Sequence, residues 1–183
     1  MPAPEKTTLD AIVAAGRALV EQGGLDGLTM QAVAERVGVR APSLYKRVRD
    51  RRELLALVVG ATVDDLATRL EATVSDPDPR RRIVAQADGL RRFAHEHPVG
   101  FALVFGAHDA PRPEPAPATR TVAPLLDAVA EITGPDHALD GARLVTAWTN
   151  GFITMELAGS LRMGGDVDAA WAWGLERIVG ALG

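Results

Sequence analysis

Residues 28–55 read LTMQAVAERVGVRAPSLYKRVRDRRELL, and this stretch decides the fold of the chain. Thr29 is a residue type that caps helices, and the segment 30–37 that follows carries its apolar residues at helical spacing. Gly38 ends this helix, and Pro42 occupies a position at which a second helix can start without losing a needed N–H group. Two short helices joined by a tight turn that contains glycine are the pattern of a helix-turn-helix.

The second of these helices, predicted for Ser43 to Val48, exposes polar groups on one surface. Its outward residues are expected to be Ser43, Lys46 and Arg47, with Tyr45 along the edge. A hydroxyl, an ammonium, a guanidinium and a phenol group suit contacts with the phosphates and base edges of DNA.

The basic residues of the chain are concentrated around this motif. The formal net charge is −4, but between Arg36 and Arg52 seven basic residues stand against the single acid Asp50. The rest of the chain is therefore acidic, and a small cationic surface on an acidic body indicates a nucleic-acid contact. A charge run alone is equally well explained as a solvated helix face, but its position within the motif favours DNA binding.

The remaining sequence also has helical periodicity, and no alternation of β-branched residues indicates a strand. We predict an all-α protein with a three-helix, homeodomain-like part at residues 1–52 and a longer helical part at residues 53–183. A glycine pair at 23–24 is expected to end the first helix, and four prolines predict a loop over residues 106–118. The nine predicted helices are at residues 8–22, 30–37, 43–48, 51–70, 80–96, 99–105, 119–132, 139–162 and 167–182.

Composition excludes several kinds of site. The chain has no cysteine, which rules out disulfides, zinc–thiolate sites and thiol catalysis. No leader segment opens it and no apolar run approaches the ~20 residues of a membrane span, so we expect a cytoplasmic protein with no membrane partner. His95 and His97 are two positions apart and would point to different sides of a helix. We expect no metal, no cofactor and no enzymatic activity; a small helical-bundle enzyme and a helical adaptor protein are the weaker alternatives.

The segment 28–55 resembles the DNA-binding signature of the TetR family of bacterial repressors. That signature has a threonine-led helix, an alanine and a Gly-Val pair at fixed spacing, a Leu-Tyr pair and a basic residue shortly before Leu-Leu. The match stays in register from Leu9 onward. The segment 148–159 is also similar to a ligand-domain subgroup of the family with a Trp, a His-Gly pair and a Leu-Glu-Leu tail, although Asn150 stands in place of the histidine.

This resemblance implies a DNA-binding transcriptional regulator that acts as a homodimer. It implies a repressor that a small-molecule effector releases from a palindromic operator in double-stranded DNA. DNA binding is then assigned to residues 1–52, and ligand binding and dimerisation to residues 53–183. A helix-turn-helix protein that binds DNA without any ligand is the alternative.

The resemblance also implies roles for single residues of the motif. Positions that usually hold the phosphate backbone are matched by Thr29, Tyr45, Arg47 and Arg51. Positions that face bases or their methyl groups are matched by Gln31, Ala41, Pro42, Ser43 and Lys46. Family members often have Ser or Thr where this chain has Arg40, a poor cap that could cost about 1 kcal/mol unless Arg40 gains a phosphate contact.

For the effector, the resemblance implies a pocket between the fourth and eighth helices. The candidate residues by position are Phe93, His97, Phe101, Phe105, Trp148, Asn150, Phe152, Met155 and Glu156. Asn150 and Glu156 are the polar groups that could orient a ligand. Aromatic and methionine side chains at helical spacing are more often ordinary core, and Glu156 is more often the partner of a nearby arginine.

For the dimer, the resemblance implies that the last two helices pack as a four-helix bundle with those of a second copy. The residues compatible with such an interface are small or apolar: Gly151, Ala158, Gly159, Ala170, Trp171, Gly174, Leu175 and Ile178. A core within a single chain is the alternative explanation of the apolar face of the last helix.

Overall fold

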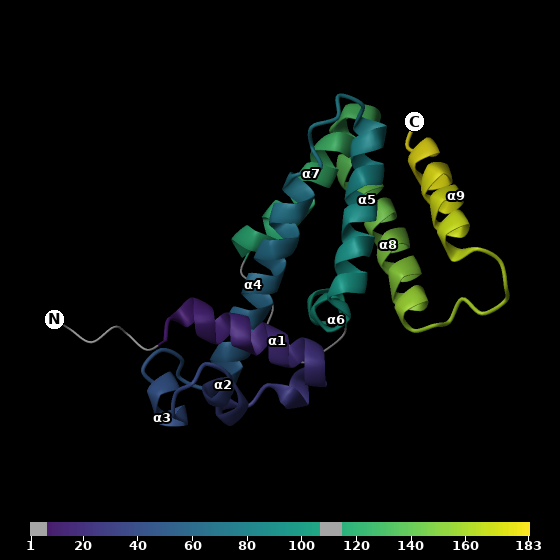
Figure 1. The fold of residues 1–183 in the computed structure, drawn as a ribbon. Helices are drawn as coiled ribbons and strands as arrows, with labels where there is room; N and C mark the ends of the chain where they lie inside the picture. Colours follow the sequence, from purple (N-terminus) through teal and green to yellow (C-terminus); the bar gives the residue numbers. More distant parts are fainter. Residues whose placement is uncertain (1–6, 107–114) are drawn as a thin grey trace. The chain divides into compact units, whose positions relative to one another are not determined.

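The computed structural model describes residues 7–106 and 115–183, and these residues form nine helices and no strand (Figure 1). The predicted all-α class is confirmed. The helices are α1 (Leu9–Gly27), α2 (Met30–Arg36), α3 (Ala41–Leu44), α4 (Arg51–Glu71), α5 (Pro79–Glu96), α6 (Pro98–Phe105), α7 (Pro115–Thr133), α8 (Ala138–Leu157) and α9 (Val167–Gly180).

Two of the helix starts are capped as the sequence predicts. The hydroxyl oxygen of Thr29 accepts a hydrogen bond from the backbone N–H of Ala32 at 3.0 Å, at the start of α2. The carboxylate of Asp50 accepts from the backbone N–H of Glu53 at 2.8 Å, at the start of α4. This second bond lowers the pKa of the Asp50 carboxyl group, because it stabilises the charged form. Both caps satisfy N–H groups that have no partner within their helix.

Two glycines decide where helices break. Gly24 has a φ of +64° and interrupts α1, as the glycine pair predicts, although a further turn extends the helix beyond it. The prediction for α8 was wrong at its end: the helix stops at Leu157 instead of Arg162. Gly159 follows with a φ of +61°, a conformation that glycine adopts without steric cost and that ends helices.

The third and seventh helices also differ from the prediction. α3 is limited to Ala41–Leu44, and a turn in which the Val48 N–H donates to Leu44 O at 2.9 Å continues it. α7 begins at Pro115, inside the segment predicted as a loop. Proline is tolerated in the first turn of a helix because the N–H it lacks would have no acceptor there. The part of the predicted loop at residues 107–114 lies outside the described residues.

The chain divides into two compact units, of which the first contains residues 1–64 and 97–115. Its described part has an aliphatic core to which α1, α2, α3, α4 and α6 contribute. The fully or almost fully buried members of this core include Ile12, Val20, Leu28, Val33, Leu44, Val48, Leu54, Val58 and Leu103. Glu21 of α1 fixes α6 to this unit, since its carboxylate accepts hydrogen bonds from the N–H groups of Val99 and Gly100 at 3.2 and 2.7 Å.

The second unit contains residues 65–96 and 116–183. Within it, α9 packs against both α5 and α8 (Figure 1). Its buried side chains include Leu66, Ile83, Phe93, Val129, Ile153 and Leu175. Arg80, at the start of α5, donates to the carbonyl oxygens of Val179 and Gly183, each at 2.5 Å, so the start of α5 lies beside the end of α9.

Candidate nucleic-acid interface

The turn between α2 and α3 has the hydrogen bonds expected of a tight helix-to-helix connection. The N–H of Val39 donates to Ala34 O at 2.9 Å, and that of Gly38 donates to Glu35 O at 3.2 Å. Gly38 has a φ of +73°, which favours glycine at this position. Leu44 of α3 is completely buried and attaches the second helix to the core. The local geometry is that of a helix-turn-helix.

The solvent side of α3 and of the turn that follows carries polar groups. Tyr45 is 54% exposed, and Pro42, Lys46 and Arg47 are exposed as well. No side chain caps α3, because Arg40 at the N-cap position makes no capping hydrogen bond, as predicted. The phenol, ammonium and guanidinium groups can donate hydrogen bonds to phosphate oxygens or base edges.

Four further candidate DNA-contact residues of the motif are either hydrogen-bonded within the protein or partly buried. The hydroxyl oxygen of Thr29 accepts the capping bond of α2, which leaves its own hydrogen available for donation. Gln31 is exposed and donates through Nε2 to Glu35 Oε1 at 2.7 Å. Ala41 and Ser43 are partly buried, so only part of each faces solvent.

Arg51 has a role that the sequence did not indicate. Its Nε donates to Leu28 O at 2.6 Å and its Nη2 donates to Leu25 O at 2.5 Å. These carbonyls lie in the last turn of α1 and in the connection to α2, so the side chain joins the start of α4 to that region. Three of the five N–H donors of a guanidinium remain for other contacts.

The aromatic candidates for the effector site belong to both units. Phe101 and Phe105 of α6 are in the first unit, with ring centroids 4.9 Å apart. In the second unit, Trp148 and Phe152 pack together at 5.4 Å, and each lies 5.2 Å from Trp171. The second group forms a compact aromatic cluster between α8 and α9.

The other candidates have different environments. Phe93 is fully buried, with the guanidinium of Arg69 at 5.5 Å from its ring centroid. Met155 is 49% exposed, and His97 precedes α6 in the first unit. The side-chain oxygen of Asn150 is buried and has no hydrogen-bond partner among the described residues. Such an acceptor is unusual in a protein interior.

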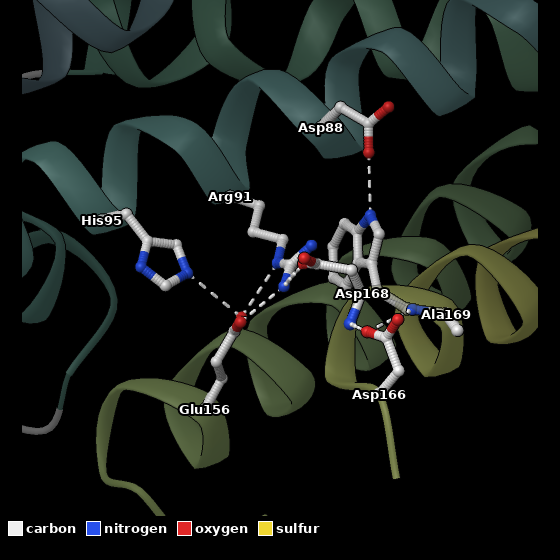
Figure 2. A network of polar contacts seen from close by, with 8 residues as sticks. Asp88, Arg91, His95, Glu156, Asp166, Asp168 and Ala169 are labelled. Carbon is white, nitrogen blue, oxygen red and sulfur yellow. Dashed lines mark hydrogen bonds and ion pairs between the residues drawn. The ribbon is translucent and has the colours of Figure 1, made fainter.

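Glu156 takes part in an ion-pair network that joins α5, α8 and α9 (Figure 2). Arg91 donates to its two carboxylate oxygens at 2.9 and 2.5 Å and also to Asp168 Oδ1 at 2.6 Å. His95 Nε2 lies 3.2 Å from the same carboxylate. The hydrogen bonds from Arg91 lower the pKa of the Glu156 carboxyl group, and His95 acts in the same direction. The arginine partner, the alternative given by the sequence, is therefore present.

Three of the hollows that described residues form lie apart from most of these candidates. The largest of the three, about 820 Å³, lies between α5 and α9. One of about 660 Å³ adjoins the network of Figure 2, and one of about 460 Å³ is lined by residues of α4, α5 and α7. Glu156 is the single candidate effector residue that lines any of these three.

The predicted interface residues separate into exposed and buried ones. Trp171 and Leu175 are 3% and 2% exposed, and Gly174 is buried against Trp148, so these three belong to the core of a single chain and offer little surface to a second copy. Ile178 is partly buried. The exposed members are Gly151, Ala158, Gly159 and Ala170, of which Ala158 and Gly159 lie beyond the end of α8.

Two exposed apolar residues near this surface were missed by the sequence analysis. Leu144 on α8 is 45% exposed, and Trp173 on α9 is 62% exposed. Leu144, Gly151 and Met155 recur at spacings of seven and four, which places them on one face of α8. This spacing was visible in the sequence, but it does not distinguish a face that meets solvent from one that meets the core.

Two family models match the chain. The model described as "Tetracyclin repressor-like, C-terminal domain" matches residues 83–178, and the one described as "Bacterial regulatory proteins, tetR family" matches residues 12–58. The chain belongs to the TetR family. It is therefore a helix-turn-helix transcriptional regulator, and the predicted family, fold and general function are confirmed. This family is a class of regulators and not of enzymes.

Other proteins are similar to this chain over most of its length. An uncharacterized HTH-type transcriptional regulator of Mycobacterium tuberculosis is 28% identical over 162 residues, which are 85% of this chain and 73% of that protein. The class C tetracycline repressor protein of Escherichia coli is 27% identical over 207 residues, covering 97% of this chain and 91% of the repressor. A protein of unknown function from Rhodococcus sp. RHA1 has the same fold, with a TM-score of 0.82 at 24% identity over 99% of this chain and 98% of its own.

Two further properties concern the described residues of this TetR-family chain. Among them, no group of three or more His, Asp or Glu side chains is arranged to hold a metal ion. Within the same residues, none of the helices combines the length and apolar character needed to cross a membrane.

Proposed function

We propose that this TetR-family regulator is a repressor that binds a palindromic operator in double-stranded DNA as a homodimer and leaves it when a small molecule binds. The observation that carries the proposal is the surface formed by α3 and the turn that follows it, where Tyr45, Lys46 and Arg47 are exposed beside the buried Leu44. A helix that is anchored on one side and offers hydrogen-bond donors on the other can enter the major groove without unfolding. The relative named as a tetracycline repressor supports repression as the direction of control.

The DNA contacts fall into two classes in this proposal, all within residues 1–52. Phosphate contacts, which position the protein without reading sequence, are assigned to Thr29, Arg40, Tyr45, Arg47 and Arg51. Contacts with bases or their methyl groups are assigned to Gln31, Ala41, Pro42, Ser43 and Lys46. The exposure of Pro42, Tyr45, Lys46 and Arg47 supports this division, as do the remaining donors of Arg51.

Selection of bound duplexes from a random pool, followed by titration of variants, tests the DNA half of the proposal. Lys46→Ala should weaken the selected operator by about 1–3 kcal/mol and a scrambled duplex much less. Arg47→Ala should weaken both duplexes and reduce the salt dependence by roughly one unit of slope per half-site. Arg143→Ala, which removes an exposed arginine of α8 paired with Asp140, is the matched control.

The outcomes of this experiment are distinct. If Lys46→Ala and Arg47→Ala lower both affinities in the same proportion, the division into base and phosphate contacts is wrong. If the pool yields asymmetric sites alone, the palindromic operator is excluded, because a two-fold protein requires two-fold half-sites.

The homodimer is proposed to use the exposed face of α8 and α9, within residues 53–183. Leu144 and Met155 on α8 and Trp173 on α9 supply apolar area. Gly151 lies between Leu144 and Met155 along α8, and its lack of a side chain allows a second helix to approach closely. The space beside it is open, because a Cβ added there would meet no atom within 4 Å. Exposed large apolar side chains gathered on neighbouring helices are typical of an interaction surface.

Charge substitution on this face tests the dimer. Met155→Glu and Trp173→Glu would each bury an unpaired carboxylate at the interface, so we expect monomers at micromolar concentration in sedimentation equilibrium. Val74→Glu, which changes another exposed apolar residue of the second unit, is the control and should leave the dimer intact. A wild-type protein that sediments as a monomer under these conditions would refute the proposed assembly.

The effector is proposed to be a small, largely apolar molecule. The buried Asn150 oxygen without a partner supports a ligand that donates a hydrogen bond in the second unit, close in sequence to Trp148 and Phe152. Such a molecule releases DNA only if it binds the form with low DNA affinity more tightly than the other form. Asn150→Leu should therefore reduce the response to the effector while leaving operator binding unchanged.

A further inference from the structure

The hollow between α5 and α9 is not lined by the DNA-contact residues, by the predicted effector residues, or by Leu144, Gly151, Met155 and Trp173 of the proposed dimer surface. Small residues open it: Ala85 on α5, and Ala172 and Gly180 on α9. A Cβ added at Gly180 would meet no atom within 4 Å. The volume of about 820 Å³ is in the range of roughly 300–1,000 Å³ that small-molecule sites have.

The floor of this hollow is apolar and fixed in position. Trp171, Leu175 and Val179 form it, and all three are also packed into the core of the unit. The indole N–H of Trp171 donates to Asp88 Oδ1 at 2.7 Å, and the Arg91 guanidinium lies 5.2 Å from the ring centroid. A floor that is already ordered loses little conformational freedom when a ligand binds, which favours affinity.

Charge is unevenly distributed along the hollow. α5 and α9 are antiparallel, since Arg80 reaches a carbonyl near the end of α9 and Arg91 reaches Asp168 near its start. One end therefore carries Arg80 and Arg81. At the other end, Asp88 is engaged by the indole of Trp171. Arg81 and Asp88 are seven residues apart on α5, a span of about 10 Å along the helix axis.

Positive charge exceeds negative charge among the lining residues. Arg80, Arg81 and Arg177 line the hollow together with the acids Asp88 and Glu176. Arg81 forms ion pairs with Asp78 and Asp76, on the segment before α5, at 3.7 and 3.9 Å, but its side chain remains 75% exposed. Its guanidinium is therefore accessible to an anionic group in the hollow.

We propose that the hollow between α5 and α9 binds a small amphipathic organic anion. The anionic group lies at Arg81 and Arg80, and the apolar body lies over Val84, Leu175 and the edge of Trp171. An apolar floor with an arginine pair at one end is complementary to this class of molecule in both shape and charge. The site is separate from the proposed effector residues, none of which lines it.

Calorimetric titration of the protein with decanoate, below the micelle concentration of decanoate, tests the proposal. We expect one decanoate per protomer with a dissociation constant in the micromolar range. Ala172→Trp fills the hollow from an exposed position of α9 and should weaken binding at least tenfold. Arg81→Glu should weaken it about fivefold or more, and decanol, which lacks the charge, should lose affinity for the wild type by a similar factor.

Matched controls separate this site from general effects on the surface. Ala56→Trp on α4 and Arg92→Glu on α5 make the same changes at exposed positions that do not line the hollow, and both should bind decanoate as the wild type does. The affinity of Ala172→Trp for the operator should equal that of the wild type. Decanoate binding and operator binding are therefore measured independently, and either proposal can fail without the other. The proposal is overturned if wild type and Ala172→Trp bind decanoate equally, if the controls lose as much affinity as the test variants, or if the wild type shows no binding at millimolar decanoate.

Discussion

Arg51 provides a direct test of how the DNA-binding helices are held together. Its guanidinium donates to the carbonyl oxygens of Leu28 and Leu25 at 2.6 and 2.5 Å, which connects residues 23 and 26 positions apart in the sequence. Arg51→Ala removes both hydrogen bonds and one positive charge. The two carbonyls then have to be hydrated by water, and the start of α4 loses its link to the region between α1 and α2.

The size of the effect follows from the exposure of these groups. A hydrogen bond to a charged group contributes about 1.5–3 kcal/mol when the surroundings are dry. Arg51 is exposed, so water competes for both carbonyl oxygens and weakens the two hydrogen bonds. We therefore expect each hydrogen bond to contribute about 1 kcal/mol to the free energy of unfolding. A loss of about 2 kcal/mol corresponds to a fall in Tm of roughly 4–8 °C for a protein of this size.

Thermal unfolding followed by circular dichroism measures this loss, and Arg52→Ala is the matched control. Arg52 is the next residue of α4, is exposed, and carries the same charge. We expect Arg51→Ala to unfold several degrees below both the wild type and Arg52→Ala. Operator titration at two salt concentrations then shows whether Arg51 also contacts phosphate, since a phosphate contact changes the salt slope and a purely structural role does not. Equal melting temperatures for Arg51→Ala and Arg52→Ala would refute the structural role.

Two further predictions concern the second unit. Gly174→Ala should lower the free energy of unfolding by about 1–3 kcal/mol, because the added Cβ would lie 2.3 Å from Trp148 Cζ2. Gly60→Ala is the control and should not lower it, because a Cβ there meets no atom within 4 Å. Denaturant titration measures the free energy of unfolding of both variants. The hydrogen bonds from Arg91 are the main cause of the lowered pKa of the Glu156 carboxyl group. The pairing of Glu156 with Arg91 therefore stabilises the folded state at pH values above the ordinary pKa of 4.5, and this stabilisation is lost as the pH falls below 4.5. In Glu156→Gln the free energy of unfolding should therefore fall less between neutral and acidic pH than it does in the wild type. The same pH dependence in both proteins would contradict the pairing of Glu156 with Arg91.

Local patterns in the sequence predicted the DNA-binding motif well. Thr29 and Asp50 cap helices, Gly38 forms the turn and Leu44 is buried, all as their residue types and spacing indicate. These features are determined by residues within a few positions of one another, so a one-dimensional pattern contains the necessary information. The length of α3 was overestimated because a hydrogen-bonded turn continues the helical spacing without being a helix.

The interface and effector predictions depended on information that a pattern does not contain. Helical periodicity identifies the apolar face of α9, but it does not say whether this chain or a second copy covers that face. Trp171 is buried against the aromatic cluster of its own unit, whereas Trp173, two residues later, is 62% exposed. The choice between them is made by the packing of α5 and α8 around α9, which involves residues more than 80 positions apart.

Three arginines show the same limit for charged groups. Arg47 is exposed beside α3, Arg51 binds backbone carbonyls, and Arg91 lies between two carboxylates and a tryptophan ring. A guanidinium on a long, flexible side chain can reach any of these partners, so the tertiary neighbours determine its role and the sequence position does not. Loss of DNA affinity on substitution is therefore ambiguous by itself: at Arg47 it would report a DNA contact, whereas at Arg51 it would combine a contact with the stability of the motif. Measuring affinity and unfolding on the same variants separates the two contributions.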